Sequence, residues 1–170
     1  MAETERTFER STTVVASREG KYLTFSLSNE EYGIGILKVK EIIGMMPITL
    51  VPQTPDFVKG VINLRGKVIP VIDLKLRLGM EAVGYTERTC TIVVETESEA
   101  GRIMMGVVVD AVSEVLSIKS EDIEDAPAFG TSLDTDYILG MAKMEGGVKI
   151  LLNIDRVLNS DELTILEDVA

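Results

Sequence analysis

Acidic side chains are the residues of this chain with the most evident capacity for acid–base chemistry. Glu41 and Glu114 form one such pair, because two carboxylates facing a bound sugar can hydrolyse a glycosidic bond. Both glutamates, however, occupy the same position of a repeated segment, which runs over Gly33–Ile43 and returns at Gly106–Leu116. We call these segments the first repeat. Equivalent positions in a duplicated unit favour a shared structural role over a catalytic pair.

Other groups typical of catalysis are missing from the sequence. The chain has no histidine, the side chain used most often as a general base and metal ligand. It also lacks glycine-rich nucleotide-binding motifs, paired cysteines and the GxSxG nucleophile motif. Its single cysteine, Cys90, lies in an apolar run and is expected to be an ordinary buried or half-buried thiol. We therefore expect a binding protein and no enzyme, with no cofactor and no metal.

A second repeat singles out one arginine. The segment Gly60–Leu74 returns as Gly140–Ile154, with the same glycine spacing and the same apolar rhythm. Glu145 stands in the second copy where Arg65 stands in the first. Residues that agree between the copies are expected to build the fold, whereas this difference indicates function.

Composition limits the classes of partner. The 170 residues carry a net charge of −11 and a pI near 4.5, which disfavours nucleic acid and anionic lipid. No apolar run approaches the ~20 residues of a membrane helix. The segment Met1–Glu19 shows no apolar signal core, and a lone cysteine fits a reducing compartment, so we expect a cytoplasmic protein.

The elements that must position these residues are mostly short strands. Tyr22–Ser28 alternates apolar and polar residues at the period of a strand, and Glu31–Ile36 reads as its partner. Leu37–Ile43 fits neither period and is interpreted as a short helical turn, followed by an edge strand at Pro47–Pro52. Further strands are expected at 61–64, 68–74, 89–95 and 102–109. A flexible tail is expected at 1–20 and a terminal helix at 160–170.

Many short strands with glycine turns favour barrels or a sandwich over a parallel α/β sheet. The repeats then predict an all-β protein of two small barrels in tandem, one per copy, with short helices. We expect a single domain at 21–165, its subdomains at about 21–85 and 86–155, and a helical C-terminal segment at 156–170.

The repeated segments carry a family likeness. Asn63–Gly66 and Val71–Leu74 resemble the signature of the CheW family, the coupling proteins of bacterial chemotaxis. The resemblance continues through Glu31–Ile34, Leu37–Ile42, Gly106–Asp110 and Leu152–Ile154, and it covers about residues 20–165. It implies five-stranded SH3-like barrels. It also implies a non-catalytic adaptor that couples transmembrane chemoreceptors to the histidine kinase CheA in signalling arrays.

The resemblance also implies two interaction surfaces. Receptor-binding positions in a groove between the barrels would be Val39, Glu41, Gly60, Arg65, Gly66 and Val115. Ile48 and Leu50, on the expected edge strand, would contribute to kinase binding. The implied partners are the regulatory domain of CheA, itself a tandem barrel whose contacts can close a ring, and the cytoplasmic tips of methyl-accepting chemoreceptors. Contact with the membrane would come only through the receptors.

Each assignment has a structural alternative. Val39 and Val115 fit a core as well as a groove, and the glycines fit positions where the backbone has a positive φ or passes close to a neighbour. We predict that Arg65 pairs with Glu41 and presents that pair in the groove, the alternative being a purely structural salt bridge. The functional alternative is a CheW-like scaffold in a non-chemotactic pathway such as surface motility. A generic proline-peptide binder is disfavoured, because four Tyr and four Phe do not cluster.

Overall fold

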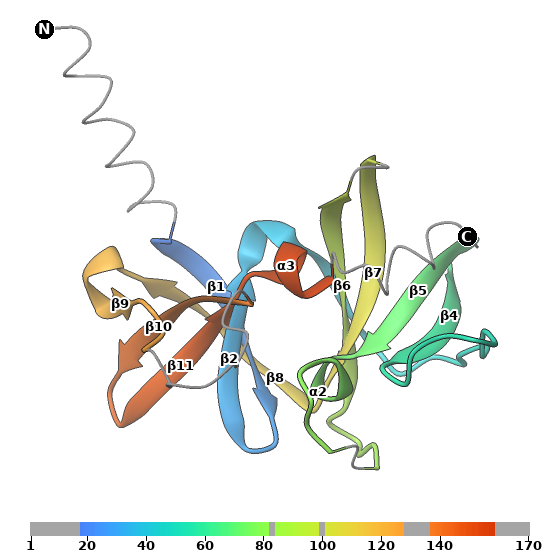
Figure 1. The fold of residues 1–170 in the computed structure, drawn as a ribbon, viewed down its shortest axis with the longest axis horizontal. Coiled ribbons are helices and arrows are strands. Elements are labelled where there is room, and N and C mark those ends of the chain that lie inside the picture. The colour runs from blue at the N-terminus through green and yellow to red at the C-terminus, as the bar shows by residue number, and fades with distance from the viewer. Residues whose placement is uncertain (1–17, 82–83, 99–100, 128–136, 159–170) are drawn as a thin grey trace, which may run out of the picture.

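Two curled β-sheets lie side by side in the computed structural model, which describes residues 18–81, 84–98, 101–127 and 137–158 (Figure 1). The six-stranded sheet has the order β8-β1-β2-β11-β10-β9, and the five-stranded sheet has the order β3-β6-β7-β5-β4. The strands of the first are β1 Gly20–Leu27, β2 Glu30–Gly35, β8 Ala111–Ile118, β9 Ile123–Glu124, β10 Ile138–Met144 and β11 Gly147–Leu152. Those of the second are β3 Val39–Gly44, β4 Val58–Leu64, β5 Lys67–Asp73, β6 Cys90–Ser98 and β7 Gly101–Val109.

Neighbouring residues of the central strands face different cores. In β6, Ile92 and Val94 belong to the largest apolar cluster, which draws side chains from both sheets, whereas Val93 lies in a smaller cluster within the five-stranded sheet. A third cluster fills the six-stranded sheet and includes Tyr22 and Leu151. Burial on both faces explains the continuous apolar runs of these strands. The large shared cluster makes the two barrels one packed unit, and the expected all-β fold with two β subdomains is confirmed.

The expectation of one barrel per repeat is wrong, because the two copies exchange their first hairpins. The β1–β2 hairpin of the first copy joins β8, β10 and β11 of the second, and the β6–β7 hairpin of the second joins β3, β4 and β5 of the first. The division between the sheets therefore does not fall near residue 85. Parallel pairs mark the two exchange points, Gly33 beside Leu151 and Val71 beside Gly106. A sequence repeat identifies equivalent strands, but it does not reveal which copy supplies their partners.

Glycine occupies both exchange points because another chain segment passes close by. A Cβ on Gly33 would lie 3.0 Å from Cδ2 of Leu151, and one on Gly106 would lie 2.8 Å from Cγ2 of Thr91 and 3.2 Å from Cγ2 of Val71. Real Cβ atoms rarely come this close to a neighbour. The glycine spacing of the repeat therefore reflects the packing of the exchanged hairpins.

Two short helices occupy equivalent positions, α2 at Leu74–Arg77 and α3 at Ile154–Leu158. The Asp73 carboxylate caps α2 by accepting the N–H groups of Lys75 and Leu76, and the Asn153 side chain accepts the N–H of Arg156 in α3. Among the described residues, no helix is long and apolar enough to cross a membrane. The tail expected at 1–20 lies outside the described residues up to residue 17, and the helix expected at 160–170 lies wholly outside them.

The segment between residues 36 and 57 differs from the prediction. Only Ile36–Lys38 is helical, as the 3-10 turn η1, and β3 follows with a register shift between Val39 and Glu41. This bulge disrupts the alternation that identifies a strand, which is why the sequence pattern was ambiguous. Pro47–Pro52 is not a strand either, since it contributes only an isolated bridge from Thr49 to Val61 of β4.

Candidate protein-interaction site

The predicted arginine lies at the tip of a tight hairpin. Leu64 and Lys67 form the last pair of β4 and β5, so Arg65 and Gly66 are the two residues of the turn. Both have positive φ, 51° and 88°, and the Asn63 side chain accepts the N–H of Gly66 at 2.8 Å. Such turns match the twist of a hairpin, but a non-glycine residue adopts this conformation at a cost in energy. In the equivalent turn of the second copy, the positive φ belongs to Gly146.

Arg65 contacts Glu41 of β3 through two hydrogen bonds. Its Nη1 donates to Oε2 at 3.3 Å, and its Nη2 makes a close contact with Oε1. The hydrogen bond from Arg65 lowers the pKa of the Glu41 carboxyl below its ordinary value, so the pair remains charged at neutral pH. Because β3 and β4 are the two edges of the five-stranded sheet, the pair helps to close that barrel. The predicted pairing is confirmed.

The pair is accessible from outside. The Arg65 side chain is 70% exposed and that of Glu41 is 29% exposed. A guanidinium has five N–H donors, and two are engaged here, so Arg65 retains donors for a partner while the carboxylate fixes its orientation.

The two glycines predicted for the site have different structural roles. Gly60 is buried with φ of 138°, and a Cβ there would lie 2.0 Å from the carbonyl oxygen of Thr49. Thr49 and Val61 exchange two backbone hydrogen bonds of 2.9 Å directly above it. Gly60 thus permits the close approach that closes the barrel edge. Gly66, in contrast, faces open space.

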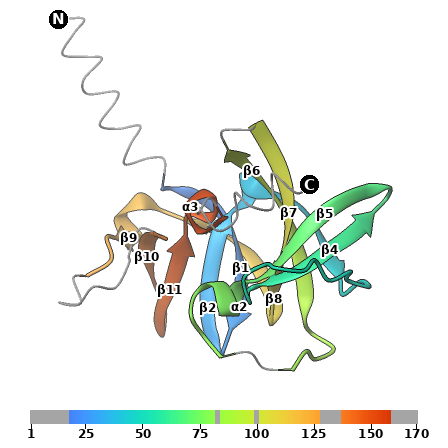
Figure 2. The same ribbon diagram turned by 45° about the vertical axis from the view of Figure 1, so that its right-hand side comes forward.

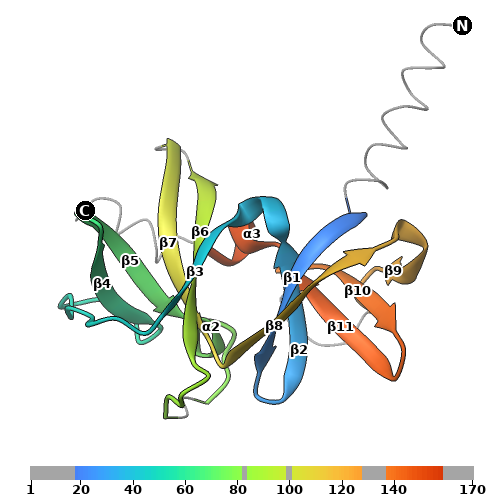
Figure 3. The same ribbon diagram turned by 180° about the vertical axis from the view of Figure 1, so that it is seen from behind.

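Apolar residues of β3 and β8 extend the candidate site across both barrels. Val115 of β8 is 49% exposed, whereas Val39 is half-buried against the large cluster. Ile42 of β3, which the sequence reasoning missed, is 45% exposed. Ile42 and Val115 are equivalent residues of the first repeat, so the alignment of its copies was the signal that could have found Ile42. Figure 3 shows β3 and β8 on the same side of the molecule, one in each barrel.

The two residues expected at the kinase surface differ in their exposure to solvent. Ile48 is half-buried against the cluster inside the five-stranded barrel. Leu50 is 80% exposed beside a hollow of about 560 Å³ that Pro52, Val58 and Lys59 also line. Leu50 is therefore the residue of this pair that a partner can reach.

The remaining reactive groups have structural partners or surroundings. The described residues hold no group of three or more carboxylate, thiol or imidazole side chains placed to bind a metal ion. Burial raises the pKa of the Cys90 thiol, which disfavours the thiolate needed for nucleophilic attack. The buried ammonium of Lys75 lies 2.8 Å from the Asp110 carboxylate. An exposed charged pair and exposed apolar residues on β3 and β8 are instead suited to binding a protein.

Comparison with known proteins gives a consistent result. The family described as CheW-like domain matches residues 21–162. The chain is 43% identical over 150 residues to "Chemotaxis protein CheW" of Klebsiella aerogenes, covering 88% of each chain. It is 36% identical over 140 residues to "Chemotaxis protein CheW" of Rhizobium meliloti, covering 82% of this chain and 88% of the relative. The crystal structure of scaffolding protein TtCheW from Thermoanaerobacter tengcongensis aligns with a TM-score of 0.74 and 38% identity, over 85% of this chain and 95% of that one.

Proposed function

The chain belongs to the CheW-like domain family, and from this premise we propose that it is a non-catalytic adaptor that couples transmembrane chemoreceptors to the chemotaxis histidine kinase CheA. The solved structure named above is described as a scaffolding protein, and the two curated relatives bear the name of a chemotaxis protein. That name favours chemotaxis over a non-chemotactic pathway such as surface motility. The protein would act in the cytoplasm, where the receptor tips and the kinase meet.

The observation that carries the receptor assignment is the exposed Arg65–Glu41 pair. Arginine is enriched among the residues that dominate protein–protein binding energies, chiefly where apolar neighbours exclude water from the contact. Ile42, on the same strand as Glu41, and Val115, on the neighbouring barrel, supply exposed apolar area on β3 and β8, the two strands that Figure 3 shows on the same side of the molecule. A helical receptor tip lying across β3 and β8 would contact both barrels.

The kinase surface would lie apart from the receptor face. Leu50 is exposed on the segment that closes the edge of the five-stranded barrel, and the residues around it belong to that barrel alone. Contact there with the regulatory domain of CheA would leave the β3–β8 face free. An adaptor needs such separate surfaces to hold two partners together.

Isothermal titration calorimetry against two partners tests this proposal. The regulatory domain of CheA and a soluble chemoreceptor tip are each titrated into the wild-type protein, Arg65→Ala and Lys67→Ala. Lys67 is the matched control, because it is an exposed cation next to the same turn. We expect micromolar binding of both partners by the wild type. Arg65→Ala should weaken receptor binding about 30-fold and retain the kinase, whereas Lys67→Ala should retain both.

Two results would overturn the assignment. Failure of the folded wild-type protein to bind either partner would refute the adaptor function. Equal weakening by Arg65→Ala and Lys67→Ala would show that the turn contributes only general positive charge.

A further inference from the structure

Within the part of the chain that the structure describes, the backbone crosses between the two barrels at two points. It leaves β2 through η1 and enters β3, and it leaves β7 through Asp110 and enters β8. Each crossover therefore leads directly into one of the two strands that carry the candidate receptor face. Both crossovers thus connect the barrels next to these strands.

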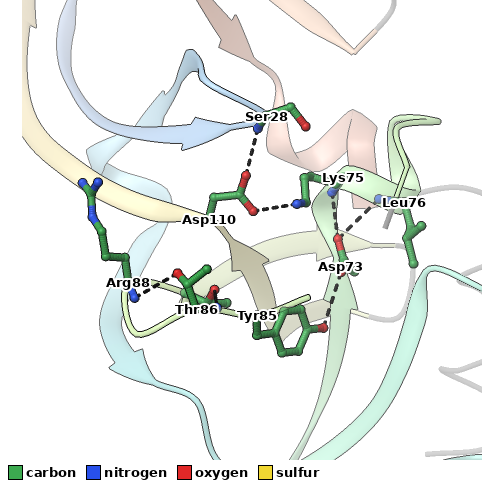
Figure 4. A network of polar contacts seen from close by, with 9 residues as sticks. Ser28, Asp73, Lys75, Leu76, Tyr85, Thr86, Arg88 and Asp110 are labelled. Atoms are coloured by element: carbon green, nitrogen blue, oxygen red, sulfur yellow. Dashed lines mark hydrogen bonds and ion pairs between the residues drawn. The ribbon is translucent and has the colours of Figure 1, made fainter. Parts of the chain in front are cut away.

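An ion pair holds the second crossover to a helix. Asp110 Oδ1 lies 2.8 Å from Nζ of Lys75 in α2, and the Lys75 residue is only 5% exposed. The other oxygen, Oδ2, accepts the N–H of Ser28 in the β1–β2 turn at 2.8 Å. Figure 4 shows the Asp110 carboxylate between these two donors. One carboxylate thus ties a helix of the five-stranded barrel to a hairpin of the six-stranded barrel.

A similar arrangement with reversed charges holds the first crossover, although Lys38 aligns in the first repeat with Ala111 and not with Asp110. Nζ of Lys38 in η1 lies 2.7 Å from Oδ2 of Asp155 in α3. The Oδ1 atom of Asp155 lies 3.4 Å from the backbone nitrogen of Glu97 in the β6–β7 hairpin. Asp155 directly follows the second copy of the second repeat, as Lys75 directly follows the first copy, so the two residues are equivalent. Here the cation is on the crossover and the carboxylate is on the helix, yet the carboxylate again holds an ammonium group and a hairpin N–H.

The side chain of Arg77, the last residue of α2, reaches across to α3. Its guanidinium carbon is 5.1 Å from the ring centre of Phe57 and 4.9 Å from that of Tyr137, which precede the two copies of the second repeat at equivalent positions. Its Nε donates to the carbonyl oxygen of Val157 at 3.0 Å, and Val157 is the repeat counterpart of Arg77 itself. The contact between α2 and α3 thus joins matching elements of the two copies, and each crossover carries one ion pair.

The two copies preserve the connection and not the residue types. A surface that binds one ligand depends on the sign of its charges, whereas a tether works equally well with either polarity. We propose that the Lys75–Asp110 and Lys38–Asp155 pairs are positioning latches, which fix the angle between the barrels and thereby the spacing of β3 and β8. The receptor readout of this proposal rests on the adaptor function proposed above.

The latches act on one surface and not on the other. The receptor face spans both barrels, so its two halves separate when the angle between the barrels changes. The kinase surface around Leu50 lies within the five-stranded barrel, so it is insensitive to that angle. Loss of a latch should therefore weaken receptor binding at least about fivefold and leave kinase binding unchanged.

Spin labels on the two barrels test the proposal directly. Val68 and Val148 are exposed, equivalent residues of the β4–β5 and β10–β11 hairpins, which lie on opposite flanks (Figure 2). Both are labelled as cysteines in a Cys90→Ala background, and double electron–electron resonance gives the distance distribution between them. Lys75→Met and Lys38→Met should each broaden or shift it. Lys40→Met is the matched control, because Lys40 pairs with Glu95 at 3.3 Å within one barrel.

Charge reversal provides a rescue. Lys38→Asp alone should disturb the distance distribution, and Lys38→Asp with Asp155→Lys should restore it, since the double variant adopts the polarity of the other latch. Unchanged distributions in folded Lys75→Met and Lys38→Met would overturn the proposal. If Lys75→Met does not fold, Lys38→Met decides, because that pair is about one-third exposed. Failure of the wild type to bind a receptor tip would refute the adaptor function, while the distances would still decide the latches.

Discussion

Replacing Gly60 by alanine should unfold the barrel edge that supports the candidate receptor site. The added Cβ would lie 2.0 Å from the Thr49 carbonyl oxygen, 2.8 Å from its carbon and 2.9 Å from Cγ2 of Ile48. Two of these three atoms belong to the backbone, so a rotamer change cannot relieve the contact. The substitution must displace Thr49 from Val61 or distort β4.

The size of the effect follows from two contributions. Alanine at φ of 138° costs about 1–3 kcal/mol in backbone strain. Loss of the two hydrogen bonds between Thr49 and Val61 costs about 1 kcal/mol each. We therefore expect Gly60→Ala to lower the free energy of unfolding by about 3–5 kcal/mol, a large part of the total for a domain of this size. The Tm should fall by about 6–20 °C.

Two further glycines provide matched controls. Gly66→Ala also requires a positive φ, 88°, but meets no atom within 4 Å, so only the strain of about 1 kcal/mol remains. Gly140→Ala is the repeat counterpart, where the Cβ would meet Cγ2 of the Ile123 side chain at 2.5 Å without a positive φ. A side chain can move, so we expect a loss of about 1–2 kcal/mol.

Urea denaturation followed by circular dichroism measures the three variants on one scale, since the chain has no tryptophan to follow by fluorescence. The expected order of destabilisation places Gly60→Ala well above the other two. A loss for Gly60→Ala within about 1 kcal/mol of that for Gly66→Ala would refute the steric argument. A variant that kept the wild-type Tm but lost receptor binding would mean that Gly60 contacts the receptor directly.

Three other predictions concern charged and phenolic groups. The Glu41 carboxyl should titrate below its ordinary pKa of 4.5, and Arg65→Ala should raise that pKa, as NMR of the labelled carboxyl can show. The contribution of the pair to folding stability is then full above the pKa of the unfolded state and is lost as the pH falls through the pKa of the folded state. Arg77→Leu should cost about 2 kcal/mol in urea denaturation, because two ring contacts and a hydrogen bond to a carbonyl disappear. Burial and the Asp73 carboxylate raise the pKa of Tyr85 from 10.0 to about 12, so folding stability should decline as the pH rises between those values. Tyr85→Phe should remove that decline. A Tyr85→Phe variant whose Tm falls with alkaline pH as the wild type's does would contradict this prediction.

The sequence predicted strands in which apolar and polar residues alternate along the chain. Tyr22–Ser28 was identified because its alternation is intact, and β1 occupies that stretch. The strand β3 was missed, because the bulge next to Glu41 shifts its register. The Arg65–Glu41 pair was predicted from a difference between two copies of one segment, which requires no knowledge of their arrangement. The partners of each hairpin were not predictable, because exchange between copies leaves the local pattern unchanged.

Burial was the other quantity that the sequence did not provide. Ile48 and Leu50 are both aliphatic and lie close together in the chain, but the first packs inside the barrel and the second is exposed. The bridge from Thr49 to Val61 lies between them, and it depends on β4, which lies further along the chain. Ile42 was missed for a related reason, since its exposure follows from the position of β3 at an edge of the sheet.

The exchange of hairpins has a consequence for the history and the integrity of the chain. Each barrel contains strands from both halves, so neither half carries a complete barrel, and the single chain has the topology of a domain-swapped dimer whose subunits have become covalently joined. A single copy arranged as in this chain would need a hairpin from a second molecule to complete its sheet. In the present protein, a backbone cut between α2 and β6 would leave two interlocked fragments. Each fragment would still depend on the other for the β-sheet in which its first hairpin is paired.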